Sequence, residues 1–254
     1  MRLKRCFVGI LVLIVTSFSL LGCKSEDKYS ASWMQKNVDL SLDNKMVLIE
    51  DDTSEMIKLD ASGMFFMEYG SSGSDWAFGY NIGGYKLEYY CVDGEQVGIL
   101  NYADELERYN ITGSMDDSRI IKDVNVVKDL FTIDYDNSKV IIHDDSDDGL
   151  AVVSLNTKEK VTVLFLDKET NECRRLEVCL LNDNGEVSEL FLAAPTPVTK
   201  ISLPDDIGDI EKVSDISADE FSSFCSRFVF SSLANASMNL ELDGSETAED
   251  NAAD

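Results

Sequence analysis

The chain has 254 residues, which suits one large domain or two small ones. Its 48 acidic and 22 basic residues give a formal net charge of −26, which repels phosphate backbones and anionic lipid headgroups and excludes nucleic acid as an expected partner. A charge of this size keeps a protein soluble without any specific partner, and cation binding is the alternative explanation.

The chain begins with a basic segment that is followed by an apolar one. Met1–Arg5 contains no acid, and Phe7–Leu21 is a run of 15 residues with almost no polar side chain. A transmembrane helix needs about 20 apolar residues, so this run is short for a membrane span and typical of a signal peptide. The run leads into Leu20-Leu21-Gly22-Cys23.

These four residues resemble the lipobox of bacterial lipoproteins. The resemblance implies that residues 1–22 are a signal peptide and that the thiol of Cys23 receives diacylglycerol, with fatty acyl chains such as palmitate. Residues 23–35 would then form a lipidated tether, and the protein would be extracytoplasmic and anchored to the bacterial cell membrane. The alternative is a plain secretory signal with an incidental cysteine.

Alternation of apolar and polar residues with a period of two indicates strands from Val38 onward. Val38, Leu40 and Leu42 give the first of them. Others are expected at Met46–Ile49, Met56–Leu59, Met64–Tyr69, Phe131–Tyr135, Lys139–His143, Val161–Leu166, Arg175–Leu181, Val187–Leu192 and Val198–Leu203. Turn residues between these runs predict an antiparallel meander.

Aromatic residues are densest between Phe65 and Tyr90, which hold nine of the 23 in the chain. In the expected strand at 76–82, large side chains alternate with small ones, so one face carries rings and the other is nearly bare backbone. Such a face usually marks a bend, a bulge or a close approach by another group. The rings are either ordinary sheet core or the lining of an apolar cleft, for which the candidates are Phe66, Trp76, Phe78, Tyr80 and Tyr89.

Two helices are expected to cover the sheet. Apolar residues over 118–131 form one stripe at helical spacing, with acids at the helix N-terminus. Ser217 and Glu220 form a capping box before a second amphipathic helix over about 218–234. We therefore expect a β domain over 36–208, a C-terminal helical segment over 209–240 that packs on it, and a disordered acidic tail over 241–254.

No constellation of residues predicts catalysis or a metal centre. His143 is the only histidine, and no nucleophile turn of the Gly-x-Ser-x-Gly type exists. Asp144, Ser146 and Asp148 followed by a glycine resemble the first half of a calcium loop, but the twelfth position is Leu155 where a bidentate Glu is required. We expect no cofactor, no metal site and no enzymatic activity, and we interpret the acidic loop as a solvated turn.

Four cysteines remain in the expected mature domain, at positions 91, 173, 179 and 225. Cys173 and Cys179 lie about 20 Å apart if they share one strand, which is too far for a disulfide. Nothing in the spacing demands a bridge, so buried free thiols are expected.

Residues 36–205 combine the expected meander with the segment Val161–Thr170, which contains an Asp-Lys-x-Thr hairpin, and with the terminal Lys200–Pro204. Together with the lipobox, these features resemble the LolA-like superfamily, the outer-membrane lipoprotein carriers. The resemblance implies a half-open β-barrel that is closed on its concave side by helices and holds an acyl chain or a similar ligand. The superfamily has no catalytic signature that could be transferred to this chain.

The stretch 64–102 also resembles small lipocalin-like lipoprotein domains, through Trp76–Tyr80 and the strand Tyr85–Cys91. Both families imply a curved antiparallel sheet that can hold an apolar ligand. The predicted fold is therefore mainly β with two or three helices, a curved antiparallel sheet (half-open β-barrel) covered by amphipathic helices.

Two functions are consistent with these features. The first is a lipid-anchored, non-catalytic protein of the cell envelope that binds a hydrophobic or amphipathic ligand, such as a lipid. The second is a scaffold or protein-interaction module with a filled core and no small ligand, which recruits an envelope protein through its acidic surface.

Overall fold

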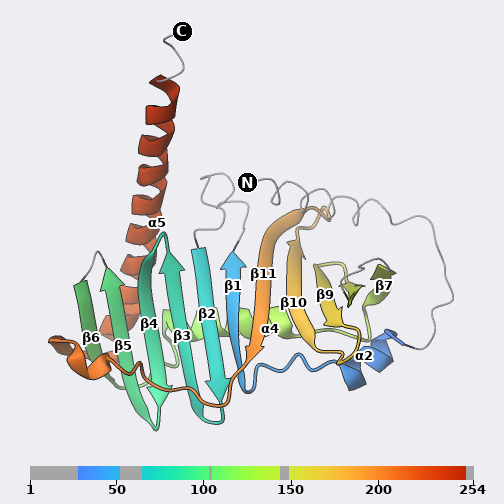
Figure 1. Ribbon diagram of the computed structural model, residues 1–254, viewed down its shortest axis with the longest axis horizontal. Helices are drawn as coiled ribbons and strands as arrows, with labels where there is room; N and C mark the ends of the chain where they lie inside the picture. Colours follow the sequence, from blue (N-terminus) through green and yellow to red (C-terminus); the bar gives the residue numbers. More distant parts are fainter. Residues whose placement is uncertain (1–27, 52–64, 103–104, 144–148, 250–254) are drawn as a thin grey trace.

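The computed structural model describes residues 28–51, 65–102, 105–143 and 149–249 (Figure 1). The predicted signal peptide, Leu20, Leu21, Gly22 and Cys23 lie outside these residues, and so do the expected strand Met56–Leu59 and the acidic loop with Asp144, Ser146 and Asp148.

The described strands form one open twelve-stranded sheet, in the order β12-β6-β5-β4-β3-β2-β1-β11-β10-β9-β8-β7. Neighbours pair antiparallel, except β12 and β6, which are parallel. The strands are β1 (Lys45–Asp51), β2 (Phe65–Ser72), β3 (Asp75–Ile82), β4 (Tyr85–Val92), β5 (Glu95–Tyr102), β6 (Glu105–Thr112), β7 (Lys139–His143), β8 (Leu150–Asn156), β9 (Lys160–Asp167), β10 (Cys173–Leu181), β11 (Val187–Pro197) and β12 (Lys212–Ser217). The prediction of a mainly β fold, with a curved sheet that does not close into a barrel, is confirmed.

Three α-helices accompany the sheet within the described residues: α2 (Ala31–Asn37), α4 (Arg119–Phe131) and α5 (Ala218–Glu249). In Figure 1, α4 and α5 lie behind the sheet and cover the same face. The capping box predicted for α5 is present, because the Ser217 N–H donates to Glu220 Oε2 at 3.0 Å and the Glu220 N–H donates to Ser217 Oγ at 3.3 Å. Within the described residues, no helix is both long enough and apolar enough to cross a membrane.

The core extends along the helix-covered face of the sheet, from the ring-bearing face of β2–β5 to residues of β1 and β8–β11. Phe78, Tyr80 and Tyr89 are at most 2% exposed there and pack among residues of α4 and α5. Gly98 on β5 makes room for Phe221 of α5, because a Cβ atom at that position would lie 2.4 Å from Cε2 of the ring. The absence of a side chain at Gly98 therefore sets how closely α5 approaches the sheet.

The opposite face of β1–β4 is crossed by the chain between β11 and β12 (Figure 1). Ile201 of this crossing segment is buried in a small cluster with Ala77 and Val92. The segment contains the short helix η1 (Ile207–Asp209) and no strand over Val198–Leu203, so the expected strand there is absent. The close approach expected beside the bare face of 76–82 is therefore made in part by this chain's own crossing segment.

Two other expected strands are loops. Residues 38–42 follow α2 directly, and their alternating apolar side chains pack at the edge of the core without pairing to a neighbouring strand. Residues 132–138 form a turn in which the Asp134 carboxylate accepts the N–H of Asn137 at 3.1 Å. An alternation of apolar and polar residues indicates which side chains are buried. It does not require that the backbone forms hydrogen bonds with a neighbouring strand.

Both ends of the described chain are more helical than expected. α2 begins at Ala31, inside the segment interpreted as a tether, and Met34 anchors it in the core with no exposed surface. α5 continues to Glu249, past the expected boundary at 240 and into the segment expected to be disordered. Leu240, Leu242 and Ala248 have high intrinsic helix propensity. The expectation of disorder rests on the lack of large apolar residues alone and does not include this preference.

Candidate ligand-binding groove

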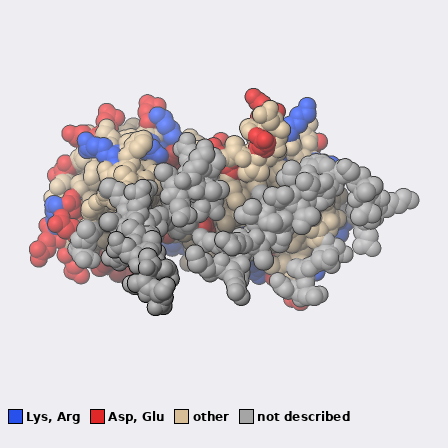
Figure 2. Space-filling view, turned by 90° about the horizontal axis from the view of Figure 1, so that it is seen from above, with Lys and Arg blue, Asp and Glu red and all other residues tan. Residues whose placement is uncertain are grey.

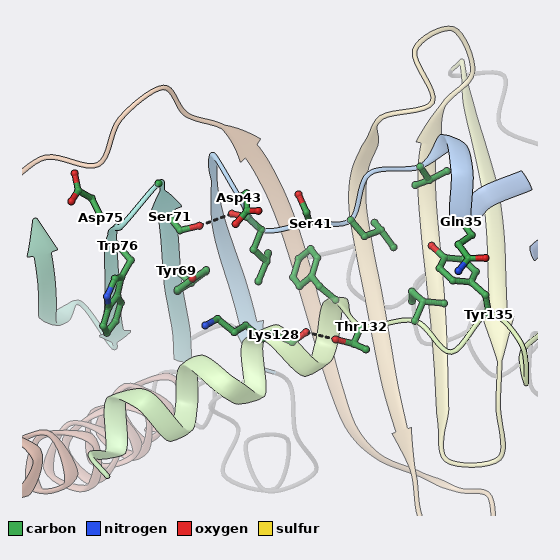
Figure 3. Close-up of a pocket in the computed structure, with 16 residues that line it drawn as sticks. Gln35, Ser41, Asp43, Tyr69, Ser71, Asp75, Trp76, Lys128, Thr132 and Tyr135 are labelled. Carbon is green, nitrogen blue, oxygen red and sulfur yellow. Dashed lines mark hydrogen bonds between the residues drawn. The ribbon is translucent and has the colours of Figure 1, made fainter. Parts of the chain in front are cut away.

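An open groove of about 660 Å³ lies on the helix-covered side of the sheet (Figure 3). Its walls come from α2 and the chain that follows it, from the C-terminal end of α4, and from the turn between β2 and β3. The apolar part of the lining includes Val38, Leu40, Leu42, Phe131 and Ile133. A volume of this size lies within the usual range of ligand pockets, about 300–1,000 Å³.

The α4 wall is held in place by a lysine on a distant strand. Lys160 Nζ donates to the carbonyl oxygens of Asp129 at 2.7 Å, Leu130 at 3.0 Å and Thr132 at 2.9 Å. Helix C-terminal carbonyls lack partners within the helix, and a cation there also meets the negative end of the helix dipole. Burial lowers the pKa of Lys160 to about 8. This contact fixes the turn that presents Phe131 and Ile133 to the groove.

The other end of α4 is tied to β3. Tyr80 donates from its hydroxyl to Asp123 Oδ2 at 2.5 Å, and Arg119 Nε donates to the same oxygen at 3.1 Å. Burial raises the pKa of Tyr80, and the charge of Asp123 raises it further. Contacts at both ends therefore fix the position of α4, which forms one wall of the groove.

The strand side of the groove is also preorganised. Ser71 is buried, and its hydroxyl donates to the carbonyl oxygen of Leu42 at 2.8 Å, which holds the chain before β1 against β2. Trp76 packs on Tyr89, with ring centroids 4.8 Å apart. Asp75 Oδ1 accepts the N–H of Asp93 at 3.1 Å. These contacts place one indole ring and one carboxylate at the groove.

The groove carries charges of both signs. Asp43 and Asp75 lie along the strand side, whereas Lys128 extends from α4 toward Tyr69 and Trp76 (Figure 3). Lys128 Nζ lies 5.9 Å from the centroid of the Tyr69 ring, within reach of a cation–π interaction. Burial raises the pKa of Tyr69.

The predicted cleft residues do not come together in this groove. Trp76 lines it, but Phe78, Tyr80 and Tyr89 are buried core beneath the helices. Phe66 lies on the opposite face of β2, because Phe65 and Met67 beside it point into the core. Side chains alternate across a strand, so the aromatic stretch supplies both faces and most of its rings are structural.

Several lining residues gave no signal in the sequence. Lys128 is an ordinary exposed residue of an amphipathic helix, and Asp43 is a turn residue before a strand. Their shared groove arises only when α4 docks on β1–β3. The apolar Leu40 and Leu42 were recognised, but as members of a strand.

Other chemically notable groups sit in structural roles. His143 Nε2 lies 3.1 Å from Ser154 Oγ, and burial lowers the pKa of His143. The four described cysteines are free thiols. Burial raises the pKa of Cys173, Cys179 and Cys225 to about 12. Across the described ranges, no group of three or more His, Cys, Asp and Glu side chains is placed to hold a metal ion.

Comparison with known proteins gives similarity at the level of structure only. No protein-family model matches the chain, and no curated protein matches it either. The chain is similar to a crystal structure described as an outer membrane lipoprotein-sorting protein domain from Vibrio parahaemolyticus, with 11% identity over 71% of this chain and 96% of that one, and a TM-score of 0.27. This similarity concerns overall architecture alone, and no ligand or residue role follows from it.

Proposed function

We propose that this protein is a lipid-anchored, non-catalytic binding protein of the bacterial cell envelope, which holds an amphipathic ligand in the groove beside α4. The observation that carries the proposal is the groove itself, whose lining joins apolar side chains to polar ones in one space of about 660 Å³. Ligand sites are typically lined mostly by apolar groups, whereas the lining of this groove is somewhat more polar than apolar, which favours an amphipathic ligand over a wholly apolar one.

The position of the groove along the chain suits a ligand taken from or near a membrane. Gln35 and Val38 of the groove wall follow closely after Cys23, the predicted lipidation site. Seven residues lie between Ser30, which caps α2, and the end of the predicted signal peptide, so even an extended connection spans at most about 25 Å. A lipid at Cys23 would keep the groove within that order of distance from the bilayer.

The anchor has a direct test. Mass spectrometry of full-length protein made in bacterial cells should find an N-terminal Cys23 carrying diacylglycerol, and the Cys23→Ser variant should lack it. A mature N-terminus at another residue, with an unmodified thiol, would leave the protein secreted without an anchor.

Ligand binding is tested by chain length. In a series of octyl, decyl and dodecyl maltosides below their micelle concentrations, each added methylene buried in the groove contributes about 0.8 kcal/mol, or about fourfold in affinity. Leu40→Asn, in the groove, should weaken binding across the series. Leu106→Asn, on an exposed position of β6, is the matched control. Affinities that do not change with chain length would contradict an apolar ligand-binding groove.

A protein-interaction module is the second candidate, and the surface favours it. Figure 2 shows acidic side chains gathered at the end of the molecule where β6 and β12 lie. Exposed acids there include Glu105, Glu211 and Asp215. A partner recruited by these charges should be released as ionic strength rises, because salt screens exposed charges. Binding that persists in high salt would count against this candidate.

A further inference from the structure

The two sides of the groove carry opposite charges. The strand side has Asp43 and Asp75, and the α4 side has Lys128 (Figure 3). These groups belong to three separate segments, so no helix or sheet repeat places them together. The arrangement lets one bound molecule meet a carboxylate on one side and an ammonium group on the other.

These charges are open to a ligand. Across the part of the chain that the structure describes, neither Lys128 nor Asp43 takes part in an ion pair. Lys128 is exposed, and its ammonium group lies 5.9 Å from the centroid of the Tyr69 ring. Asp75 has one oxygen on the Asp93 N–H, which leaves the second oxygen for another donor.

We propose that the groove selects amphiphiles whose head group carries both a positive and a negative charge, with the apolar chain on Phe131, Ile133 and Leu40. This inference rests on the proposed function and names the class of ligand. The anionic part of the head group meets Lys128, and the cationic part meets Asp43 and Asp75.

The aromatic lining strengthens the preference for a cationic part. Trp76 lines the groove next to Asp75 in the sequence, and ring faces attract cations, ammonium groups included, whereas the Tyr69 ring is already within reach of Lys128. A purely anionic head group would face these two carboxylates and the net charge of −26. A purely cationic head group would face Lys128. A head group with both charges satisfies the two sides together.

The test uses four ligands that share a dodecyl chain and differ only in the head group. They are dodecylphosphocholine, dodecyl phosphate, dodecyltrimethylammonium and dodecyl maltoside, each titrated below its micelle concentration into the full-length protein. Trp76 and Trp33 are the only tryptophans, so a Trp33→Phe background makes intrinsic fluorescence report on the groove. Dodecylphosphocholine is expected to bind about fivefold to tenfold more tightly than the other three.

Substitutions of the charged groove residues test which of them recognises the anionic part of the head group and which recognises the cationic part. Lys128→Met should remove the advantage of dodecylphosphocholine over dodecyltrimethylammonium. Asp43→Asn combined with Asp75→Asn should remove its advantage over dodecyl phosphate. Lys122→Met on α4, and Asp205→Asn combined with Asp209→Asn on the crossing segment, change the same charges at exposed positions outside the groove and should leave the ranking intact.

The outcomes separate the two proposals. Equal affinity for all four ligands would overturn head-group selection and leave the amphiphile-binding function standing. The absence of binding by any of the four would overturn both. A ranking that the control variants abolish as strongly as the groove variants would also overturn selection, because it would reflect net charge alone.

Discussion

The ammonium group of Lys160 lies 3.0 Å from the carbonyl oxygen of Leu130, a residue thirty positions earlier in the chain. Lys160 also contacts the carbonyl oxygens of Asp129 and Thr132, so β9 holds the C-terminal end of α4, a helix that precedes it in the chain. The groove wall therefore depends on a residue that does not line the groove.

Replacement of Lys160 by Met should destabilise the fold and loosen the groove together. Three carbonyl oxygens lose a charged donor, and a hydrogen bond that involves a charged group contributes about 1.5–3 kcal/mol. We expect a loss of about 2–3 kcal/mol in urea unfolding, together with weaker binding of dodecyl maltoside. Lys158→Met, at an exposed position two residues away, should change neither. Unchanged binding in Lys160→Met would show that the turn keeps its place without the lysine.

Gly98→Ala should destabilise the protein more than Gly79→Ala. A Cβ atom at position 98 would lie 2.4 Å from the Phe221 ring, whereas one at position 79 would lie 3.3 Å from the Cγ atom of Glu88, a flexible side chain. Overpacking of a core typically costs about 1–3 kcal/mol. Thermal unfolding of the two variants measures the difference. Equal melting temperatures would mean that Phe221 moves aside freely.

Asp167 should make stability depend on pH in the acid range. Its carboxylate accepts the N–H groups of Thr170 and Glu169, both at 2.9 Å, and Arg174 lies 3.2 Å away. These contacts, the Thr170 N–H first among them, lower the pKa of Asp167 to about 2. The folded pKa lies below the unfolded value of about 3.9, so the stabilisation is present above about pH 4 and is lost as the pH falls toward 2.

Urea midpoints of the wild type and Asp167→Asn check this dependence. The difference between the two urea midpoints should be constant from pH 7 to about pH 5 and should become smaller between about pH 4 and pH 2. A difference that stays the same down to pH 2 would show that the carboxylate contributes nothing through its charge.

The buried thiols should resist alkylation in the native protein. Burial raises the pKa of Cys173, Cys179 and Cys225 to about 12, and the thiolate is the reactive form. Treatment with iodoacetamide at pH 8 followed by peptide mapping should leave these three unmodified, whereas half-buried Cys91 reacts slowly. All four should react in urea. Rapid native labelling of Cys225 would contradict the packing of α5 on the sheet.

The sequence predicted the local features of this fold well and the groove poorly. Three local patterns predicted the structure directly. They are the capping box of Ser217 and Glu220, the apolar stripe of α4, and the placement of Cys173 and Cys179 at separate positions of one strand. The groove instead needs Asp43, Trp76 and Lys128 to meet. Whether these residues come together depends on how α4 crosses the sheet. No short-range periodicity of the sequence encodes that crossing.

The mispredicted strands have the same origin. Leu40 and Leu42 alternate with polar residues because one side of the loop faces the core, and Phe131 ends α4 and begins no strand. The parallel pairing of β12 with β6 was also missed. It brings Ser214 beside Tyr109, and its six residues are mostly exposed and carry no apolar alternation.

The pairing of β1 with β11 constrains the order in which the molecule can form. Lys45 lies opposite Pro197, so the middle of the sheet cannot be completed until almost the whole sheet-forming chain has been made. The hairpins of β2–β6 and of β7–β10 join neighbours in sequence and can form early, whereas this central seam brings together residues far apart in the chain. Contacts of that kind slow folding. Until the seam forms, each half exposes an unpaired strand edge, so a chain delayed at this stage is the species most exposed to aggregation.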